Sequence, residues 1–471
     1  MMISQYWHPE QGVVQRRLAW ILGDAARAGH HITAVVPPPH YPGGQLMSDD
    51  PRNQTGAVDR STPHFTVYRC RFRPHDASIV SRVQDQAVIM CSQIITASRA
   101  IRNARAAGNP VEVIVCTVPA LPSAFVAYAL SRLHRLPLVV ELRDAWPEIL
   151  EYIDQWNDPQ RPTMNPWAKT KRALFHVLLL TGGRALRFVL SRADLLITTT
   201  GTLAAEHTRR GHPNVIAVRN RAGSGIPNCN AYPARGFGPL RVFYGGTVGR
   251  AQGLTNAIEA VALAKQQGVE VELRITGGGV FVKALERLAH KLAVDVDFTG
   301  RIPFEEMVGN YQWADTVLVH LQNWRPMEYT IPSKLFEIMW AEKHVTAAVA
   351  GEAAQIVAES QIGDVVPPMD PQALADLWVA IAQDRSRLAV DGRGNAWFRQ
   401  GSTLEELTDR WVHAIGKVVN AQHQPHSPLS QRTARKAQAT FHPVHLLQRI
   451  SEPLVQPVRR ITTAVRKRHS Q

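Results

Sequence analysis

Cysteines are few and scattered in this sequence, and none of them forms a Cys-x-x-Cys pair: they are Cys70, Cys91, Cys116 and Cys229. This spacing argues against a disulfide framework and against a zinc site built on cysteine pairs. The scarcity predicts a reduced, cytosolic setting. Cys116 ends an apolar run and is expected to be a thiol in the core.

Long apolar runs are also missing. The most apolar stretch, Val177–Leu180, is far shorter than the roughly 20 residues that span a bilayer. The opening Met1–Ile3 gives way at once to polar residues, so we expect no signal peptide. These absences predict a cytoplasmic protein, at most peripheral on the inner face of the cell membrane.

Acidic residues are too few to balance the basic ones. The chain has 39 Asp and Glu against 53 Lys and Arg, which gives a net charge of +14. The excess predicts an anionic partner, such as nucleotide phosphates or an acidic membrane surface. Nucleic acid is not expected, because the charge gathers in residues 421–471 and no aromatic-and-basic RNA-binding signature accompanies it. That segment, in which Glu452 is the only acid, predicts a disordered basic tail or, from Val458 onward, a basic amphipathic helix on anionic lipid.

Strand-like and helix-like segments alternate in the first half of the chain. The β-branched runs predicted as strands are Ile32–Val36, Thr66–Arg71, Val111–Cys116, Leu138–Glu141, Leu195–Thr199 and Val215–Val218. Helical patterns lie between them, for example Ala120–His134 and Thr202–Arg210. A very short strand, a loop ending at Gly12 and a helix over 13–28 come first. This order predicts a parallel sheet covered on both faces, with the first loop at its carboxyl edge.

Glycine and proline crowd into residues 222–239, and the same pattern then begins again. The predicted elements are strand Val242–Tyr244, glycine loop Gly245–Arg250, helix Leu254–Lys265, strands Val271–Thr276, Phe298–Thr299, Val317–Leu321 and Val345–Val349, and a last helix Glu405–Val419. The fold class is therefore α/β, with two Rossmann-like domains facing across a cleft. We expect domains at 1–222 and 240–400, a linker at 223–239, a helix at 401–420 packing back on the body, and a tail at 421–471.

The stretch from Pro332 to Glu337 has the composition of a helix start aimed at a phosphate. Proline suits the first turn, and the amides of Ser333 and Lys334 belong to the turn in which backbone donors are unpaired and the helix dipole is positive. Glu337 follows Ser333 by one turn and shares its face. Such a cradle suits a nucleotide diphosphate with ribose hydroxyls on the carboxylate. The alternative is an ordinary buried helix.

Six motifs stand in an order that resembles family-4 glycosyltransferases, and most of all the branch described as L-fucosamine-transferase-like. They are Gly29-His30, residues 38–44 (Pro-Pro-His-Tyr-Pro-Gly-Gly), residues 143–148 (Arg-Asp-Ala-Trp-Pro-Glu), residues 249–254 (Gly-Arg-Ala-Gln-Gly-Leu), Pro332-Ser333-Lys334 and Gly351-Glu352. The resemblance covers about residues 3–384, and therefore both halves of the chain.

This resemblance implies a GT-B fold and a retaining transfer of a hexose-type sugar. The donor would be a nucleotide-diphosphate sugar held by the second domain. The acceptor would be a glycan, a lipid-linked sugar or a small molecule held mainly by the first domain, in cell-envelope or exopolysaccharide biosynthesis. No cofactor and no metal are expected, since helix dipoles and basic side chains usually take the metal's role in this fold.

Family roles carry over to several positions. Glu337 matches the glutamate that holds the donor ribose, with Ser333 and Lys334 beside the diphosphate. Gly12 matches the glycine of the first loop that approaches the donor phosphate, and Arg301 falls where the backbone meets the base.

Two further positions lie in the family's cleft-facing loop. Asp144 would position or deprotonate the acceptor hydroxyl, with Arg143 beside it. The alternative is that Arg143 and Asp144 form a local ion pair that fixes the loop.

The sequence departs from the family pattern in the loop after the first strand of the second domain. Many members carry an Arg after a glycine and a Lys before a later glycine, where this chain has Thr247 after Gly246, and Gln252. We expect these three residues to line the diphosphate and Arg250 to supply the charge. Glu328 and Glu337 match the family's paired glutamates, and Glu328 is therefore expected to bind substrate, although eight residues separate the two against the usual seven, a spacing that shifts Glu328 relative to the reacting sugar.

Two other functions share these features. A nucleotide-sugar 2-epimerase would have the same fold, and a degenerate transferase would act as a scaffold of a polysaccharide assembly complex. Residues 161–192, which mix basic and apolar side chains, predict either a membrane-facing helix or an amphipathic helix packed on the sheet.

Overall fold

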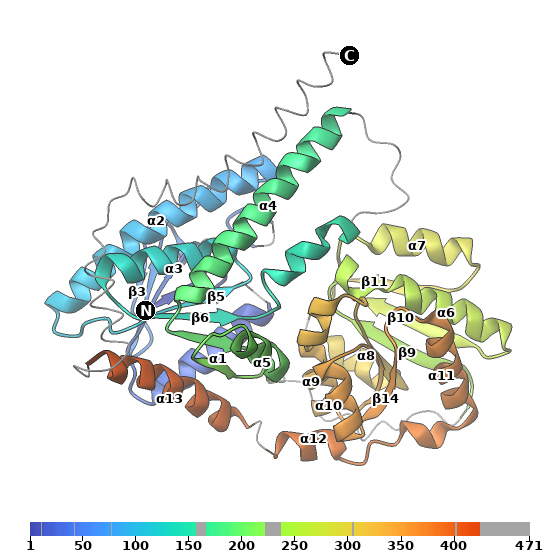
Figure 1. Cartoon of the computed structure of the whole chain (residues 1–471). Coiled ribbons are helices and arrows are strands. Elements are labelled where there is room, and N and C mark those ends of the chain that lie inside the picture. Colours follow the sequence, from blue (N-terminus) through green and yellow to red (C-terminus); the bar gives the residue numbers. More distant parts are fainter. Residues whose placement is uncertain are drawn as a thin grey trace.

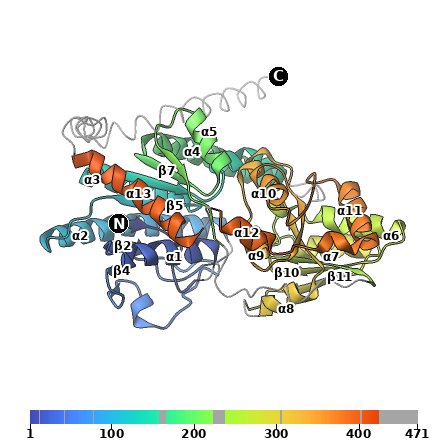
Figure 2. The ribbon, with the colours of Figure 1, turned by 90° about the horizontal axis from the view of Figure 1, so that it is seen from below.

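The computed structural model describes residues 1–10, 12–41, 43–76, 78–156, 166–221, 237–303, 306–400 and 403–423, with the side chains of Ile79, 153–175 and Leu178 excepted. In these ranges the chain forms two α/β units that lie side by side (Figures 1 and 2). Each unit is built on one sheet with helices on both faces. The α/β class and the two-domain arrangement predicted from the alternating pattern are confirmed.

The first domain contains an eight-stranded sheet in the order β3-β4-β2-β1-β5-β6-β7-β8. Its strands are β1 (Met2–Ile3), β2 (Ile32–Val36), β3 (Val58–Asp59), β4 (Phe65–Arg69), β5 (Ile114–Val118), β6 (Leu138–Leu142), β7 (Leu195–Thr198) and β8 (Val215–Ala217). All pair in parallel except β3, which runs antiparallel to β4 at the edge. The central strands β5, β6 and β7 are buried throughout, as a parallel sheet covered on both faces requires.

Two hydrophobic cores flank this sheet. The helices of the domain are α1 (Val13–Arg27), α2 (Ile79–Ala106), α3 (Leu121–His134), α4 (Pro166–Arg192) and α5 (Gly201–Arg209), with 3-10 helices η1 (Pro51–Asn53) and η2 (Glu148–Trp156). Helices α2, α3 and α4 build one core. The other core is shared by α1 and by α13 (Leu404–His423), which returns from the second domain and lies along the first (Figure 2). Trp411 of α13 is buried there, and Thr408 Oγ1 donates to Asp24 Oδ2 of α1 at 3.1 Å.

The second domain contains a six-stranded, fully parallel sheet in the order β11-β10-β9-β12-β13-β14. Its strands are β9 (Leu240–Gly245), β10 (Val271–Thr276), β11 (Val296–Gly300), β12 (Thr316–His320), β13 (His344–Ala348) and β14 (Gly363–Val366). Its helices are α6 (Thr255–Gln266), α7 (Val282–Lys291), α8 (Met307–Trp313), α9 (Ser333–Trp340), α10 (Glu352–Ser360), α11 (Pro371–Gln383) and α12 (Arg393–Phe398), with η3 (Arg250–Gln252), η5 (Arg325–Tyr329) and η6 (Arg385–Leu388). Trp378 is buried in the core under α6, α7 and α11, and Phe336 in the core under α8, α9, α10 and α12.

Each sheet reverses its strand order once, and the reversal fixes where a ligand can bind. In the first domain β1 lies between β2 and β5, and in the second β9 lies between β10 and β12. Open parallel sheets bind ligands outside the carboxyl ends of the strands at such a switch point. The loops that follow β1 and β9 are the first loop and the glycine loop singled out from the sequence.

The two domains contact each other through a carboxylate. Glu352, the first residue of α10, accepts hydrogen bonds from Thr202 N at 2.8 Å and Thr202 Oγ1 at 2.9 Å. Its other oxygen accepts from Arg219 Nη2 at 2.8 Å. Nearby, Thr200 Oγ1 donates to the Tyr329 carbonyl at 2.8 Å.

Several elements differ from the expectation in extent. The strand predicted at 111–116 begins at Ile114, because its register follows its neighbour: Ile114 pairs with Leu138 of β6. Cys116 is fully buried, as expected. The tail was predicted at residues 421–471, but 421–423 belong to the helix α13; residues 424–471 lie outside the described residues, as does most of the linker. No helix in the described part of the chain combines the length and the apolarity needed to cross a bilayer.

Candidate active site at the carboxyl ends of the two sheets

Helix α9 begins at Ser333, one residue later than the sequence suggested, and Pro332 takes the position before the first turn. Pro332 has φ −58° and ψ 125°, and its carbonyl accepts the first helical bond from Leu335 N at 2.9 Å. Leu335, Phe336, Ile338 and Met339 are buried in the core. Ser333, Lys334 and Glu337 therefore lie on the face of the helix turned away from that core.

Lys334 extends into the loop that follows β9. Its Nζ lies 3.5 Å from the centroid of the Tyr244 ring, a cation–π contact. A Cβ added to Gly246 would lie 3.1 Å from the same Nζ. The Nζ is buried and has no hydrogen-bond partner in the described part of the chain. Burial lowers the pKa of Lys334 to about 7, although the charge of Glu337 acts in the opposite direction.

The glycine loop is held in main-chain contact with the loop after β10. A Cβ on Gly277 would lie 1.8 Å from the Gly246 carbonyl oxygen, and one on Gly279 would lie 2.0 Å from the Val248 carbonyl oxygen. Gly246 and Gly277 both have φ of +141°, where side chains are strained. Glycine is therefore required at this crossing. The exposed Arg301 lies beside it, since a Cβ on Gly278 would approach Arg301 Nε to 2.6 Å.

Of the other residues predicted in this loop, Thr247 and Gln252 hold its backbone in shape, and Arg250 supplies a positive charge. The Thr247 carbonyl accepts from the Tyr244 hydroxyl at 2.7 Å, and Gln252 Oε1 accepts from Gly249 N at 3.1 Å. Both contacts shape the loop. Arg250 lies with its guanidinium carbon 5.9 Å from the centroid of the Phe281 ring, and its buried Nε has no hydrogen-bond partner among the described residues.

A histidine that the sequence analysis did not single out lies beneath this loop. His320 ends β12, with Nδ1 2.8 Å from the Gln252 carbonyl and Nε2 2.8 Å from Asn256 Nδ2. Burial lowers the pKa of His320 to about 4, and the charge of Lys334 acts in the same direction. His320 is therefore neutral and supports the loop. The signal for it was its place at the carboxyl end of an apolar strand.

Glu337 connects α9 to the first domain. Arg16 Nη1 of α1 lies 3.1 Å from Glu337 Oε1. Burial raises the pKa of Glu337, and Arg16 opposes this shift. Arg16 lies one turn after Gly12, so this contact brings the amino end of α1 and that of α9 together. A Cβ on Gly12 would lie 2.6 Å from Gln15 Oε1.

Arg143 lies under the amino end of α1. Its Nη2 donates to the Val13 carbonyl at 3.2 Å and to Asn220 Oδ1 at 3.3 Å, and its Nη1 lies 3.7 Å from Glu141 Oε1. Burial lowers the pKa of Arg143 to about 10, aided by the charge of Arg17. Burial raises the pKa of the neighbouring Asp144, against the influence of Arg143.

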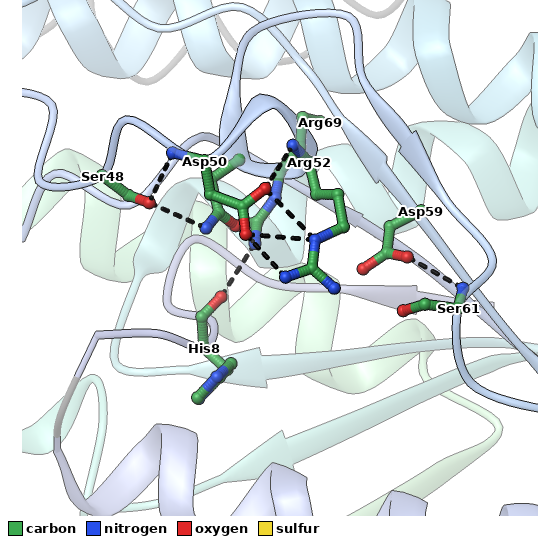
Figure 3. A network of polar contacts seen from close by, with 8 residues as sticks. His8, Ser48, Asp50, Arg52, Asp59, Ser61 and Arg69 are labelled. Atoms are coloured by element: carbon green, nitrogen blue, oxygen red, sulfur yellow. Dashed lines mark hydrogen bonds and ion pairs between the residues drawn. The ribbon is translucent and has the colours of Figure 1, made fainter.

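The first loop is fastened by two buried polar side chains. Glu10 Oε1 accepts from the backbone N–H groups of His40 and Tyr41, each at 2.9 Å, and Glu10 Oε2 accepts from Gln15 Nε2 at 2.9 Å. Arg69 donates to the His8 carbonyl at 2.8 Å and to the Pro37 carbonyl at 3.0 Å. Its contact with the His8 loop, and the Asp50–Arg52 pair beside it, are drawn in Figure 3. The loops after β1 and β2 therefore form one framework.

Glu328 lies in η5, and it is exposed, as are Thr247 and Arg301. The Glu328 backbone packs against Gly351, where an added Cβ would lie 2.1 Å from the Glu328 carbonyl oxygen. The structure places Gly246, Thr247, Arg250 and Gln252 in one loop beside Lys334. It joins Glu337 to the helix that follows Gly12, and Glu328 faces solvent.

The two halves of the chain match two protein-family descriptions. Residues 12–221 match "Glycosyl transferase 4-like domain", and residues 239–384 match "Glycosyl transferases group 1". The first half of the chain, with its eight-stranded sheet, thus resembles one glycosyltransferase domain, and the second half, with its six-stranded sheet, resembles another.

Individual relatives fit this class. WbjE of Pseudomonas aeruginosa, assigned as a glycosyltransferase, is 32% identical over 141 residues, which cover 29% of this chain and 34% of WbjE. WcaL of Escherichia coli, assigned as a colanic acid biosynthesis glycosyltransferase, is 26% identical over 203 residues, which cover 42% of this chain and 50% of WcaL. The alignments thus span a third to a half of these relatives.

Solved structures share the fold across both domains. HepE of Anabaena, in complex with UDP-glucose, aligns with a TM-score of 0.55 at 15% identity over 88% of this chain and 99% of its own. WaaG, a glycosyltransferase involved in lipopolysaccharide biosynthesis, gives 0.56 at 15% identity with the same coverage. At this identity the likeness concerns the fold.

Proposed function

We propose that this protein is a retaining glycosyltransferase that moves a hexose-type sugar from a nucleotide-diphosphate sugar to a glycan, lipid-linked or small-molecule acceptor in cell-envelope or exopolysaccharide biosynthesis. The observation that supports it best is a pair of cationic nitrogens, Lys334 Nζ and Arg250 Nε. Both are buried without hydrogen-bond partners among the described residues, and both belong to the surroundings of the glycine loop. Desolvated cations are stabilised by a bound anion.

The chemistry of sugar transfer needs charge at this place. When the bond between sugar and phosphate breaks, positive charge develops on the ring and negative charge on the diphosphate. Groups that are already in position around that diphosphate stabilise the transition state more than the ground state. Lys334, Arg250 and the amino end of α9 would carry this role without a metal at the diphosphate. A charge pair at about 4 Å is worth on the order of 4 kcal/mol at an effective dielectric of 20.

The rest of the site is assigned accordingly. Glu337 accepts from the donor ribose, Ser333 and Gly246 line the diphosphate, and Gly12 leaves space for it in the first loop. Arg301 lies beside the base. Donors of this type are bound by HepE, whose solved complex holds UDP-glucose.

The acceptor belongs to the first domain. Asp144 would receive the proton of the acceptor hydroxyl, because its pKa is raised by burial toward the working pH. Arg143 is occupied by Glu141, Val13 and Asn220, so it positions this loop. The role that follows from the L-fucosamine-transferase-like motifs is transfer to a lipid-linked acceptor. WcaL, with its assignment to colanic acid biosynthesis, supports a polysaccharide product.

A membrane surface is part of this proposal, with the protein on the cytoplasmic side. Phe188 of α4 is 43% exposed, and the Arg192 guanidinium carbon lies 5.2 Å from its ring centroid. Val80 and Val83 at the start of α2 are also exposed. Apolar and basic side chains together suit an anionic lipid surface. Flotation with anionic vesicles at low salt tests this, and a Phe188→Ser variant should float less.

The test of the main proposal is a screen of nucleotide sugars by thermal shift, followed by mass spectrometry of products with candidate acceptors. The product mass should show transfer of a hexose, and the NMR signal of its anomeric proton should show retained configuration. Two experiments separate the alternatives. If the protein converts the donor sugar when incubated with the donor alone, it is an epimerase. If calorimetry detects no binding of a nucleotide diphosphate, the protein is a non-enzymatic scaffold.

A further inference from the structure

A cluster of ionisable side chains in the first domain takes no part in the mechanism above. His40 follows β2, His75 lies between β4 and α2, and Asp85 is in the second turn of α2. One nitrogen of each imidazole and one Asp85 oxygen all lie within 4.8 Å of one another. Asp85 Oδ2 is 3.6 Å from His40 Nε2 and 3.9 Å from His75 Nε2.

The carboxylate at the centre of this cluster is unsatisfied. Asp85 is fully buried, and its Oδ1 accepts from Arg73 N at 2.8 Å. Its Oδ2 has no hydrogen-bond partner among the described residues, because both imidazole nitrogens stand beyond hydrogen-bond distance. A buried carboxylate oxygen without a partner lowers the stability of the fold, so a cation bound to this atom would stabilise the protein.

Both imidazoles are held in the orientation that a metal ligand needs. His40 Nδ1 lies 2.8 Å from the Pro38 carbonyl, and His75 Nδ1 lies 2.9 Å from the Asp76 carbonyl. A carbonyl can only accept, so each Nδ1 carries a hydrogen, and Nε2 of each ring faces Asp85 Oδ2. Metal-binding histidines are fixed in this way by a carbonyl on the other ring nitrogen.

The spacing fits a small tetrahedral ion. With metal–ligand bonds of about 2.0–2.1 Å, ligand atoms around zinc stand about 3.3 Å apart. The separations of 3.6 and 3.9 Å from Asp85 Oδ2 are close to that value, and the two imidazole nitrogens lie within 4.8 Å of each other, so the rings would move together slightly on binding the ion. Two imidazoles and one carboxylate are donors that first-row transition metals prefer.

We propose that His40, His75 and Asp85 bind a divalent transition-metal ion, Zn²⁺ being the best fit, which clamps the loop after β2 and the segment before α2 onto that helix. The side chains are only 7%, 11% and 0% exposed, and because they supply three ligands, a water molecule would take the fourth position of a tetrahedral ion. The same segments already meet through the backbone, since Gly44 N donates to the His40 carbonyl and His75 N to the Gly44 carbonyl. Glu10 connects this clamp to the first loop through His40 N. The ion would be separate from the donor diphosphate.

The experiment titrates the full chain, stripped with a chelator, with Zn²⁺ by calorimetry and with Co²⁺ by visible absorption at neutral pH. One equivalent should bind, and Co²⁺ should show the intense bands of tetrahedral coordination. His75→Gln and Asp85→Asn should each weaken the binding of this equivalent by about 100-fold or more, since loss of an outer partner alone costs 10–100-fold. Zn²⁺ should also raise the Tm of the wild type and leave that of His75→Gln unchanged.

His31 gives a matched control. Its ring lies 4.7 Å from that of His64, in a histidine pair that belongs to no three-ligand group among the described residues. His31→Gln should bind Zn²⁺ as the wild type does. His75 is the main test position, because its side chain is the most exposed of the three, and circular dichroism checks that the variant folds. Wild-type protein without a specific equivalent, His75→Gln with wild-type affinity, or a Tm insensitive to Zn²⁺ would each overturn the proposal and leave an ion pair between His40 and Asp85.

Discussion

The buried charge of Lys334 is expected to lower the stability of the unliganded protein and to favour the binding of a diphosphate. Its ammonium group is buried against Tyr244 without a hydrogen bond among the described residues, which destabilises the unliganded protein. In the proposed function, the same charge would stabilise a bound diphosphate. Residues of this kind are found where activity takes precedence over stability.

Replacing this lysine should separate the two effects. In Lys334→Met the unfolding free energy should be unchanged or higher by about 1–3 kcal/mol, the cost of an unsatisfied polar group. Donor-dependent kcat/KM should fall by about 10²–10³-fold, given a charge pair worth on the order of 4 kcal/mol. Urea unfolding and initial-rate kinetics measure the two quantities.

Lys265 is the control for that substitution, because its exposed side chain contacts only the Ala293 carbonyl in the contacts described for it. Lys265→Met should change neither quantity appreciably. A Lys334→Met variant with wild-type turnover would contradict the assignment of the diphosphate site.

The pKa of Lys334 gives a prediction for pH. Because burial lowers the pKa to about 7 in the free protein, a bound diphosphate should raise it again and take up a proton. Donor affinity should therefore fall as pH rises above about 7. Calorimetry in buffers of different ionisation enthalpy should show proton uptake near pH 7.5 in the wild type and none in Lys334→Met.

The same pKa fixes how stability depends on pH. The folded pKa lies below the unfolded value of about 10.4, so the cost of the buried charge is complete below pH 7 and disappears as pH rises toward 10.4. The stability gained in Lys334→Met should accordingly be largest at low pH. A gain that grew with pH would speak against a buried ammonium.

Which site residues could be predicted depended on whether their signal was local. The helix start at Ser333 and the charge of Lys334 beside it could be predicted, because both lie within a few residues of sequence. Arg16 and His320 were missed, because their relevance comes from contacts with Glu337 and with the Gln252 carbonyl that form only when distant segments fold together. Glu328 was assigned by spacing, and its side chain faces solvent.

At the scale of elements, the amino end of α1 offers a test of close packing. Gly12→Ala would place a Cβ 2.6 Å from Gln15 Oε1, whose side chain is buried and bound to Glu10. We expect a loss of about 1–2 kcal/mol in unfolding free energy, as for other overpacked sites, and a clear fall in donor affinity. Thermal unfolding and donor titration measure these.

Gly23 lies on the same helix and meets only Arg27 Nη1, at 3.8 Å, when a Cβ is added. Gly23→Ala should therefore stabilise the protein by about 0.5–1 kcal/mol and leave donor affinity unchanged. Equal effects of both substitutions would mean that the first loop has no special role.

The elements themselves were largely readable from periodicity, and the exceptions have physical causes. Buried parallel strands such as β6 and β13 are continuous apolar runs and were placed within a residue or two. The two-residue edge strand β3 carries no such run, and it forms only by pairing with β4. Helix α9 starts one residue later than expected because proline can occupy either the first turn or the position before it.

At the scale of the whole molecule, the packing of the two domains depends on contacts between distant segments, which no local sequence pattern predicts. Helix α13 completes a core of the first domain although it follows the second in sequence, with Trp411 buried beside α1. The Glu352 carboxylate accepts hydrogen bonds from Thr202 N and Arg219 Nη2 of the first domain. Burial alone would raise the pKa of Glu352, but these donors lower it overall.

Glu352 is thus the residue whose change should loosen the domains. Glu352→Gln removes the charge that Arg219 meets while keeping an acceptor for Thr202 N, and Arg219 is one-third exposed, so we expect a loss of about 1–2 kcal/mol. Donor KM should rise several-fold, because Arg16 and Glu337 would no longer be held in register. Calorimetric unfolding and donor kinetics check this.

The exposed Glu359 on the same helix provides the control, and Glu359→Gln should behave as wild type. A glutamate with a lowered pKa stabilises the protein above its unfolded pKa of about 4.3, and this contribution is lost as pH falls below that value. The difference between wild type and Glu352→Gln should therefore be complete at neutral pH and shrink on acidification. A difference that persisted at low pH would show that Glu352 acts through shape alone, and the charge of Arg219 would then play no part in joining the domains.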